Sequence, residues 1–215
     1  MSNLGGCGQG GWTLAMTIDG SKVILIIRDY MINSFLPIQT FKSGSSYWIN
    51  GVTYNIESGL ADPRTTEAKY NAFSSIAFSS ICIGMNYSGS TKFLLIEKSG
   101  SSLQNVFKND AYIGTSFGRS TWKAMMAGSS LQDYCNKEGI NVKDSYGVIF
   151  ARVGIIANND PDCFTPNSYI GLGTKWNHYN TCPQSLIGVS CGNLALCYPD
   201  NGVKSVPARG YILIK

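Results

Sequence analysis

The stretch Tyr146-Gly-Val-Ile-Phe-Ala-Arg-Val-Gly-Ile-Ile-Ala157 is a long run of β-branched and aromatic residues that contains a single charge. This composition predicts a buried strand at the centre of a sheet. Farther out, Trp12–Ile18 is also dense in strand-forming residues and stops at the turn dipeptide Asp19-Gly20. Arg209–Lys215 closes the chain as another apolar run. Strands are therefore expected at both ends of the chain and near its centre.

Other segments predict shorter elements between these strands. The strand signals are Val23–Ile27, a hairpin over Tyr47–Tyr54 about Asn50-Gly51, and a pair formed by Ile76–Tyr87 and Lys92–Ile96. The helix signals are Thr65–Phe73, Leu103–Phe107 after Ser101 or Ser102, and Thr121–Ala127 between Ser120 and Gly128. Strands at both ends with short helices between them predict one α+β domain over residues 1–215.

Residues 158–207 show little periodicity and are rich in Asn, Gly, Pro, Cys and Tyr. A long irregular stretch inside a compact domain is usually functional and needs disulfides or a bound ion to hold it. We therefore expect a loop-rich binding region here.

Composition excludes several classes of protein. With 44% apolar residues, 24 glycines and only 14% charged residues, the chain is neither a coiled coil nor disordered. The net charge of +4 comes from basic residues that are scattered singly, so no nucleic-acid partner is expected. The apolar stretch Val23–Phe35 is too short and too charged to insert into a membrane. Met1–Gly6 lacks the basic and apolar regions of a secretory signal.

The seven cysteines contain no CxxC pair, and four of them lie between Cys163 and Cys197. This clustering predicts disulfides that hold irregular loops in an oxidising compartment, so the protein is expected to be secreted. The alternative is a set of reduced, buried thiols in a cytosolic protein. Because the count is odd, Cys7 in its glycine-rich segment is the candidate for pairing with another chain.

Catalytic motifs are absent from the sequence. Gly6–Gly11 matches GxGxxG in its letters, but a dinucleotide site needs a strand before this motif and a helix after it. The single histidine, His178, has no acid beside it, and the carboxylates are dispersed. We expect a protein that is not an enzyme.

Asn158-Asn159-Asp160-Pro-Asp162 is the best candidate metal site, and Asn158, Asn159, Asp160 and Asp162 are its expected ligands. Side-chain oxygens at alternate positions suit a hard cation such as Ca²⁺, which takes six to eight oxygens. The loop lacks the glycine and the final glutamate of an EF-hand. An ordinary Asn/Asp/Pro turn is the equally weighted alternative.

Aromatic residues accompany this loop in the same irregular region. Trp176, His178, Tyr179 and Tyr198 are expected to face a ligand. Sugars present apolar C–H faces and hydroxyls, so rings beside amide and carboxylate oxygens form a workable carbohydrate surface. The alternative is a small satellite core beneath a long loop.

An ordered set of motifs resembles a known family. Its members here are Gly10-Gly-Trp-Thr-Leu14, Trp12–Gly20, Tyr47-Trp48, Thr66–Lys69, Cys82–Met85, Gly118–Lys123, Cys135–Gly139, Ala151–Ile155, Asn158-Asn159 with Asp162-Cys163, and Gly210–Leu213. In this order they resemble the secreted fibrinogen-related, intelectin-like proteins of invertebrates. The resemblance runs over nearly the whole chain.

The resemblance implies a single fibrinogen C-terminal-like domain, with an antiparallel sheet, short helices and a long disulfide-braced loop region. Such domains commonly bind calcium, recognise glycans or acetylated sugars, and form homo-oligomers. The chain departs from the intelectin pattern in Cys163–Gly171, where Phe164 and Asn167 stand in place of Asn and His ligands. Asn167 still offers one oxygen. Residues 22–39 are a second departure, an apparent insertion.

Two functions follow as expectations. The first is a secreted, lectin-like carbohydrate-binding protein, calcium-dependent if the Asn158–Asp162 loop holds an ion. The second is a structural or adhesive matrix component that associates with itself through Val23–Gln39 without a glycan ligand.

Overall fold

The computed structural model describes residues 4–22, 24–26, 36–175, 186 and 188–215. Its largest sheet has six antiparallel strands in the order β12-β11-β10-β9-β8-β7. Their bounds are β7 Ile113–Gly114, β8 Tyr134–Lys143, β9 Ile149–Asn158, β10 Ser168–Thr174, β11 Cys191–Ala195 and β12 Lys204–Pro207.

A second sheet has five antiparallel strands in the order β4-β1-β13-β5-β6. Their bounds are β1 Thr13–Asp19, β4 Ala68–Lys69, β5 Ile81–Tyr87, β6 Ser90–Ile96 and β13 Arg209–Ile214. A two-stranded ribbon, β2 Ile24–Ile26 with β3 Leu36–Ile38, completes the strands of the described residues.

The helices are short and lie mostly between β3 and β8. Four are α-helical: α1 Ile56–Ala61, α2 Ala72–Ser75, α3 Leu103–Lys108 and α4 Arg119–Ala124. Two 3-10 turns, η1 Gly5–Cys7 and η2 Ser46–Trp48, are added to these. None of the helices in the described part of the chain combines the length and the apolar character needed to cross a membrane.

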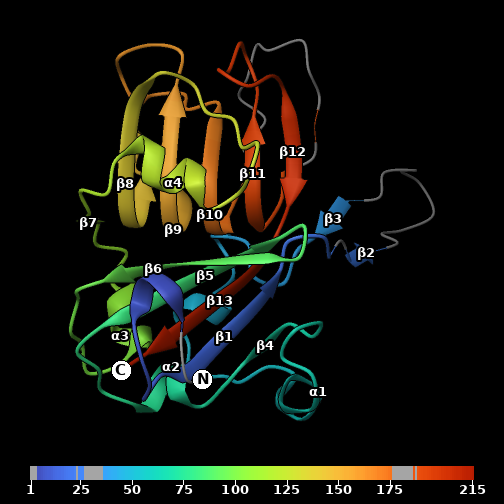
Figure 1. Cartoon of the computed structure of the whole chain (residues 1–215), viewed down its shortest axis with the longest axis vertical. Helices are drawn as coiled ribbons and strands as arrows, with labels where there is room; N and C mark the ends of the chain where they lie inside the picture. The colour runs from blue at the N-terminus through green and yellow to red at the C-terminus, as the bar shows by residue number, and fades with distance from the viewer. Residues whose placement is uncertain (1–3, 23, 27–35, 176–185, 187) are drawn as a thin grey trace.

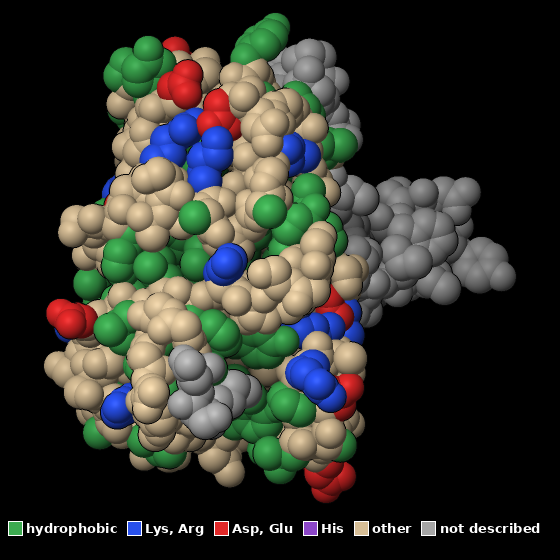
Figure 2. Space-filling model, in the orientation of Figure 1, with side chains coloured by type: hydrophobic (Ala, Val, Ile, Leu, Met, Phe, Trp, Pro, Cys, Tyr) green, Lys and Arg blue, Asp and Glu red, His purple; other side chains and the backbone are tan. Residues whose placement is uncertain are grey.

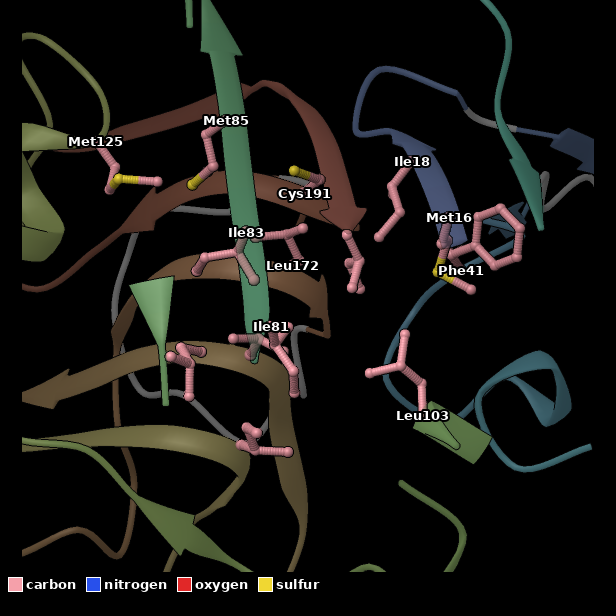
Figure 3. Close-up of a cluster of buried hydrophobic side chains, with 14 of the residues drawn as sticks. Met16, Ile18, Phe41, Ile81, Ile83, Met85, Leu103, Met125, Leu172 and Cys191 are labelled. Atoms are coloured by element: carbon pink, nitrogen blue, oxygen red, sulfur yellow. The ribbon is translucent and has the colours of Figure 1, made fainter. Parts of the chain in front are cut away.

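Figure 1 places the six-stranded sheet above the five-stranded sheet, with both chain termini beside the lower one. One hydrophobic core joins the two sheets, because it takes side chains from β1, β5 and β13 as well as from β9 and β10. In Figure 3, Ile81, Ile83 and Met85 are spaced along β5, with Leu172 and Cys191 of the other sheet beside them. The period of two along β5 is the alternation that a strand imposes on its side chains.

A row of glycines crosses the six-stranded sheet. Gly139, Gly154, Gly171 and Gly192 stand opposite one another on four neighbouring strands. A methyl group on Gly154 would lie 2.5 Å from the carbonyl oxygen of Ile170 and 2.9 Å from the Cα of Gly171. The strands therefore approach one another along this row more closely than side chains would allow.

The strongest strand predictions are confirmed. The run Tyr146–Ala157 forms β9, between β8 and β10 in the larger sheet. Trp12–Ile18 forms β1, and Arg209–Lys215 forms β13, which pairs with both β1 and β5. In the lower sheet, β5 and β6 pair as predicted from Ile76–Tyr87 and Lys92–Ile96.

Some local predictions are wrong. The Asn50-Gly51 hairpin does not form, because the segment holds η2 and one isolated bridge between Tyr54 and Lys69. Thr65–Phe73 is not one helix, since β4 runs through its centre and only α2 follows. The helix predicted over Leu103–Phe107 is confirmed as α3. Ser102 caps it, because its hydroxyl accepts a hydrogen bond from the backbone amide of Asn105 at 3.1 Å.

The prediction that 158–207 is irregular also needs correction. Three strands, β10, β11 and β12, lie inside this stretch and form one side of the larger sheet. All residues of β10 are buried, so the sequence Ser168-Tyr-Ile-Gly-Leu-Gly-Thr174 carries no alternation of polar and apolar positions. Its glycines further weaken the strand signal. The result is a mostly antiparallel structure with few short helices, compatible with the α+β class.

Disulfides connect distant parts of the described chain. Cys7 pairs with Cys82, and Cys135 pairs with Cys163. Cys197 is also disulfide-bonded, while Cys191 is a free, buried thiol. The expectation that Cys7 remains for another chain is therefore wrong. Disulfides are typical of proteins from oxidising compartments.

Candidate functional site

The candidate site lies at one end of the six-stranded sheet, where β9 passes into β10 and β11 ends. Tyr134 at the start of β8 stands opposite Asn158 at the end of β9, and Ser168 stands opposite both Ala157 and Ala195. We call residues 158–167 and 196–202 at this end the loop end. It is uppermost in Figure 1.

The predicted metal ligands come together here through their own hydrogen bonds. The amide nitrogen Nδ2 of Asn158 donates to Oδ1 and to the carbonyl oxygen of Asp162, each at 3.2 Å. Asn159 donates to the carboxylate of Asp160 at 3.1 Å. The loop thus forms the hydrogen-bonded turn that was the alternative to a metal site.

Asn167 brings β10 into the same cluster. Its Nδ2 donates to Oδ1 of Asn159 at 3.0 Å and more weakly to Oδ1 of Asn158 at 3.4 Å. Asn167 is only 5% exposed, and its Oδ1 has no hydrogen-bond partner. A buried carbonyl without a partner is costly, so this oxygen is the least satisfied group of the cluster.

Gln132 anchors both halves of the loop end, and the sequence reasoning missed it. Its Nε2 donates to the carbonyl of Cys197 at 2.7 Å, and its Oε1 accepts from the amide of Asn167 at 3.2 Å. The backbone amide of Gln132 donates a hydrogen bond to the Ser168 hydroxyl at 2.9 Å. A lone glutamine after a glycine-serine turn carries no sequence signal for this role. The Cys135–Cys163 disulfide adds a covalent anchor to the first loop.

Asp200 fixes the second loop to α4. Its carboxylate accepts hydrogen bonds from Arg119 at 2.7 Å, from the amide of Leu131 at 3.1 Å, and from Lys123. Partial burial acts to raise the pKa of this carboxyl, but the hydrogen bonds from Lys123, Leu131 and Arg119 outweigh burial and hold the pKa at about 2.

Asp200→Asn is therefore expected to lower the free energy of unfolding at neutral pH by about 1 to 2 kcal/mol, allowing for screening by solvent. Since the folded-state pKa lies below its usual range, this contribution is present above about pH 4 and is lost as the pH falls towards 2. Urea titrations of both proteins across this range measure it. Asp133→Asn is the matched control, because that side chain is 72% exposed beside the same arginine. A difference that does not shrink in acid would contradict the assignment.

Exposed aromatic side chains lie on the loop end or next to it. Tyr198 is 92% exposed, Tyr134 is 51% exposed, and Tyr146 contacts Phe164 with ring centroids 5.5 Å apart. Figure 2 shows hydrophobic side chains and charged groups of both signs at this end of the molecule. Tyrosine rings with an apolar body and a polar tip are common in binding surfaces.

The sequence-predicted ligand residues divide into two groups. Tyr198 and Asn167 both belong to the loop end, one fully at the surface and the other nearly buried. Trp176, His178 and Tyr179 lie outside the described residues. Tyr134 joins the site through strand pairing, because it stands opposite Asn158. Tyr146 lies in the turn between β8 and β9, and its ring contacts Phe164 of the loop end.

A cation at the loop end would have to be coordinated by oxygen ligands alone. Among the described residues, no group of three or more His, Cys, Asp and Glu side chains could hold a metal. The oxygens at the loop end come from the amides of Asn158, Asn159 and Asn167 and from the carboxylates of Asp160 and Asp162. If the side-chain amide of Asn167 were rotated by half a turn, its Oδ1 would take the place of Nδ2 beside the Oδ1 atoms of Asn158 and Asn159. The three oxygens would then repel one another, and a bound cation would relieve this repulsion. This donor set suits Ca²⁺ better than a transition metal.

Two open grooves lie away from the loop end. The larger, of about 420 Å³, runs between the edge of β6 and residues 113–117, and the smaller, of about 200 Å³, includes Asp19, Asn86 and Arg209. Neither groove is lined by a residue of the loop end.

No family model, curated protein or solved structure matches this chain. The resemblance to fibrinogen-related, intelectin-like domains therefore stays a prediction.

Proposed function

We propose that this protein is a secreted, lectin-like module that binds carbohydrate at the loop end, with calcium as an accessory ion. The observation that carries the proposal is the juxtaposition of exposed rings with an amide cluster whose Asn167 carbonyl is buried and unpartnered. The disulfides support an extracellular setting. The proposed role is binding without a catalytic step.

The chemistry of the surface suits sugars. Tyr198 and Tyr134 offer ring faces to apolar C–H groups, while the carboxylates of Asp160 and Asp162 accept hydrogen bonds from hydroxyls. Calcium would be held by Asn158, Asn159, Asp160, Asp162 and Asn167, and would order the loop on which the carboxylates stand. Because binding would rest on hydrogen bonds and ring stacking, each site would bind weakly, and a homo-oligomer would supply avidity.

A glycan array run with calcium and with a chelator tests this proposal. We expect binding to a defined set of glycans or acetylated sugars, reduced at least about tenfold by Tyr198→Ala or by Asn167→Leu. Tyr112→Ala is the matched control, because this tyrosine is 42% exposed but donates to the carbonyl of Glu138 near β7, away from the loop end.

Binding that a chelator leaves unchanged would remove calcium from the proposal and keep the aromatic surface. Absence of binding in both conditions would overturn the carbohydrate function. Concentration-dependent assembly without any glycan would then favour the alternative, a self-associating matrix component.

A further inference from the structure

Lys69 is a buried cation at the end of β4. The residue is only 1% exposed, and its Nζ lies 4.6 Å from the ring centroid of Phe73. Within the described residues, the ammonium donates hydrogen bonds only to Asn50, to its backbone carbonyl at 2.7 Å and to its side-chain Oδ1 at 3.2 Å. Burial lowers the pKa of Lys69 to about 8.

No carboxylate forms an ion pair with Lys69 among the described residues. A buried charge normally requires a counter-charge, because neutral dipoles replace only part of the lost hydration. The side-chain group that accepts from the ammonium is the neutral amide of Asn50, which would become a carboxylate if its Nδ2 were replaced by oxygen. The site is therefore electrostatically incomplete with asparagine at position 50.

Asn50 is also placed for a reaction with its own backbone. Its Oδ1 accepts from the amide of Val52 at 3.1 Å as well as from Lys69 at 3.2 Å. The next residue is Gly51, which is exposed and has no atom nearer than 3.7 Å to the position of a Cβ. In the described part of the chain, the Gly51 amide donates no hydrogen bond.

We propose that Asn50 is a site of spontaneous deamidation, and that the aspartate formed completes an ion pair with Lys69. The Gly51 nitrogen attacks Cγ of Asn50, the Cγ–Nδ2 bond breaks, and ammonia leaves with the amide proton. Water then opens the cyclic imide, at Cγ to give aspartate or at the backbone carbonyl to give isoaspartate, and either product carries the new carboxylate. The net change is the conversion of an amide and water into a carboxylic acid and ammonia, without an oxidant or a cofactor.

Two features of the structure favour this reaction. The amide of Val52 and the ammonium of Lys69 both donate to the oxygen on which negative charge develops during the attack, which is the arrangement of an oxyanion hole. The product carboxylate then lies within ion-pair distance of a buried cation that otherwise has none. Both the reaction and its product are therefore stabilised by Lys69.

The chain contains an internal control, the Asn201-Gly202 pair. The Asn201 side chain is held through Nδ2, the nitrogen that would leave in the reaction. This nitrogen donates to the carbonyls of Gly128 at 2.8 Å and Ser129 at 3.3 Å. No charged donor in the described residues contacts its oxygen. Both sites read Asn-Gly-Val and differ in the residue before the asparagine, Ile49 or Asp200, so the comparison in urea measures the effect of local sequence and the folded protein adds the effect of the fold.

The test is incubation of the native protein in heavy-oxygen water, followed by peptide mapping with mass spectrometry. We expect deamidation at Asn50 about ten times faster than at Asn201 in the folded protein, and equal rates at the two sites in urea. Lys69→Met is expected to remove most of the advantage. Equal rates in the folded protein, or a faster reaction at Asn201, would overturn the proposal.

A second measurement does not depend on the folding of a lysine variant. Asn50→Asp is expected to raise the folding equilibrium constant about tenfold over the wild-type protein in a urea titration, whereas Asn201→Asp is not. A decrease in stability on Asn50→Asp would contradict the ion pair.

Discussion

Gly154→Ala is expected to lower the free energy of unfolding by about 3 kcal/mol or more, because the added methyl group meets the backbone of the neighbouring strand β10. The new Cβ would lie 2.5 Å from the carbonyl oxygen of Ile170, 2.9 Å from the Cα of Gly171 and 3.2 Å from the Cβ of Ala151. Backbone atoms in a paired strand cannot move aside as a flexible side chain can. The strands β9 and β10 would have to separate at the centre of the larger sheet.

Urea titration followed by circular dichroism measures this effect. Gly44→Ala is the matched control, since no atom lies within 4 Å of its Cβ position and its φ is ordinary. We expect that variant to change the free energy of unfolding by less than about 0.5 kcal/mol. A Gly154→Ala protein as stable as the control would mean that the glycine row does not hold these strands together.

Arg152→Ala is expected to cost about 3 to 5 kcal/mol. The side chain is 4% exposed and connects β9 to segments from elsewhere in the chain. Its Nε donates to the carbonyl of Ser43 at 2.7 Å, while Nη1 donates to Asp110 at 2.6 Å, to Asn141 at 2.9 Å and to the carbonyl of Phe107 at 3.3 Å. Removal of the guanidinium leaves buried acceptors without donors, which adds to the loss of the ion pair.

Chemical denaturation of the purified variant checks this prediction. The surface pair of Arg64 and Asp62 supplies the comparison, because Arg64 is 89% exposed and its Nε lies 3.9 Å from the carboxylate. Arg64→Ala is expected to leave stability within about 0.5 kcal/mol of the wild-type protein. Equal losses of unfolding free energy in the two arginine variants would show that the buried hydrogen bonds of Arg152 do not stabilise the fold.

Strands were predictable from the sequence where one residue pattern dominates. β9 and β13 are dense in β-branched residues, and Ser102 is a recognisable helix cap. The sequence of β10 gives no clear strand signal. This strand is buried on both faces and contains glycines, so its polar and apolar residues do not alternate. The Asn50-Gly51 turn was misread, because Lys69 and the bridge to Tyr54 hold that segment in a loop.

Part of the candidate site was predictable for a chemical reason. The Asn158–Asp162 loop is visible because five successive positions are turn-forming or oxygen-bearing. Asn167 was expected at the site only from the family resemblance. Tyr134 joins the site through strand register and Gln132 through its side-chain hydrogen bonds, and a single sequence reveals neither. Cys7 was assigned to another chain because disulfide connectivity does not follow from spacing alone.

The most direct test of the loop end as a binding site is a crystal structure of the protein grown with calcium. The account predicts an ion coordinated by Asp160 and Asp162 with the amide oxygens of Asn158 and Asn159, and with the Asn167 amide turned so that its Oδ1 faces the ion. A structure at millimolar calcium that retains the hydrogen bonds from Asn167 to Asn159 and from Asn158 to Asp162, with no ion between these residues, would contradict it.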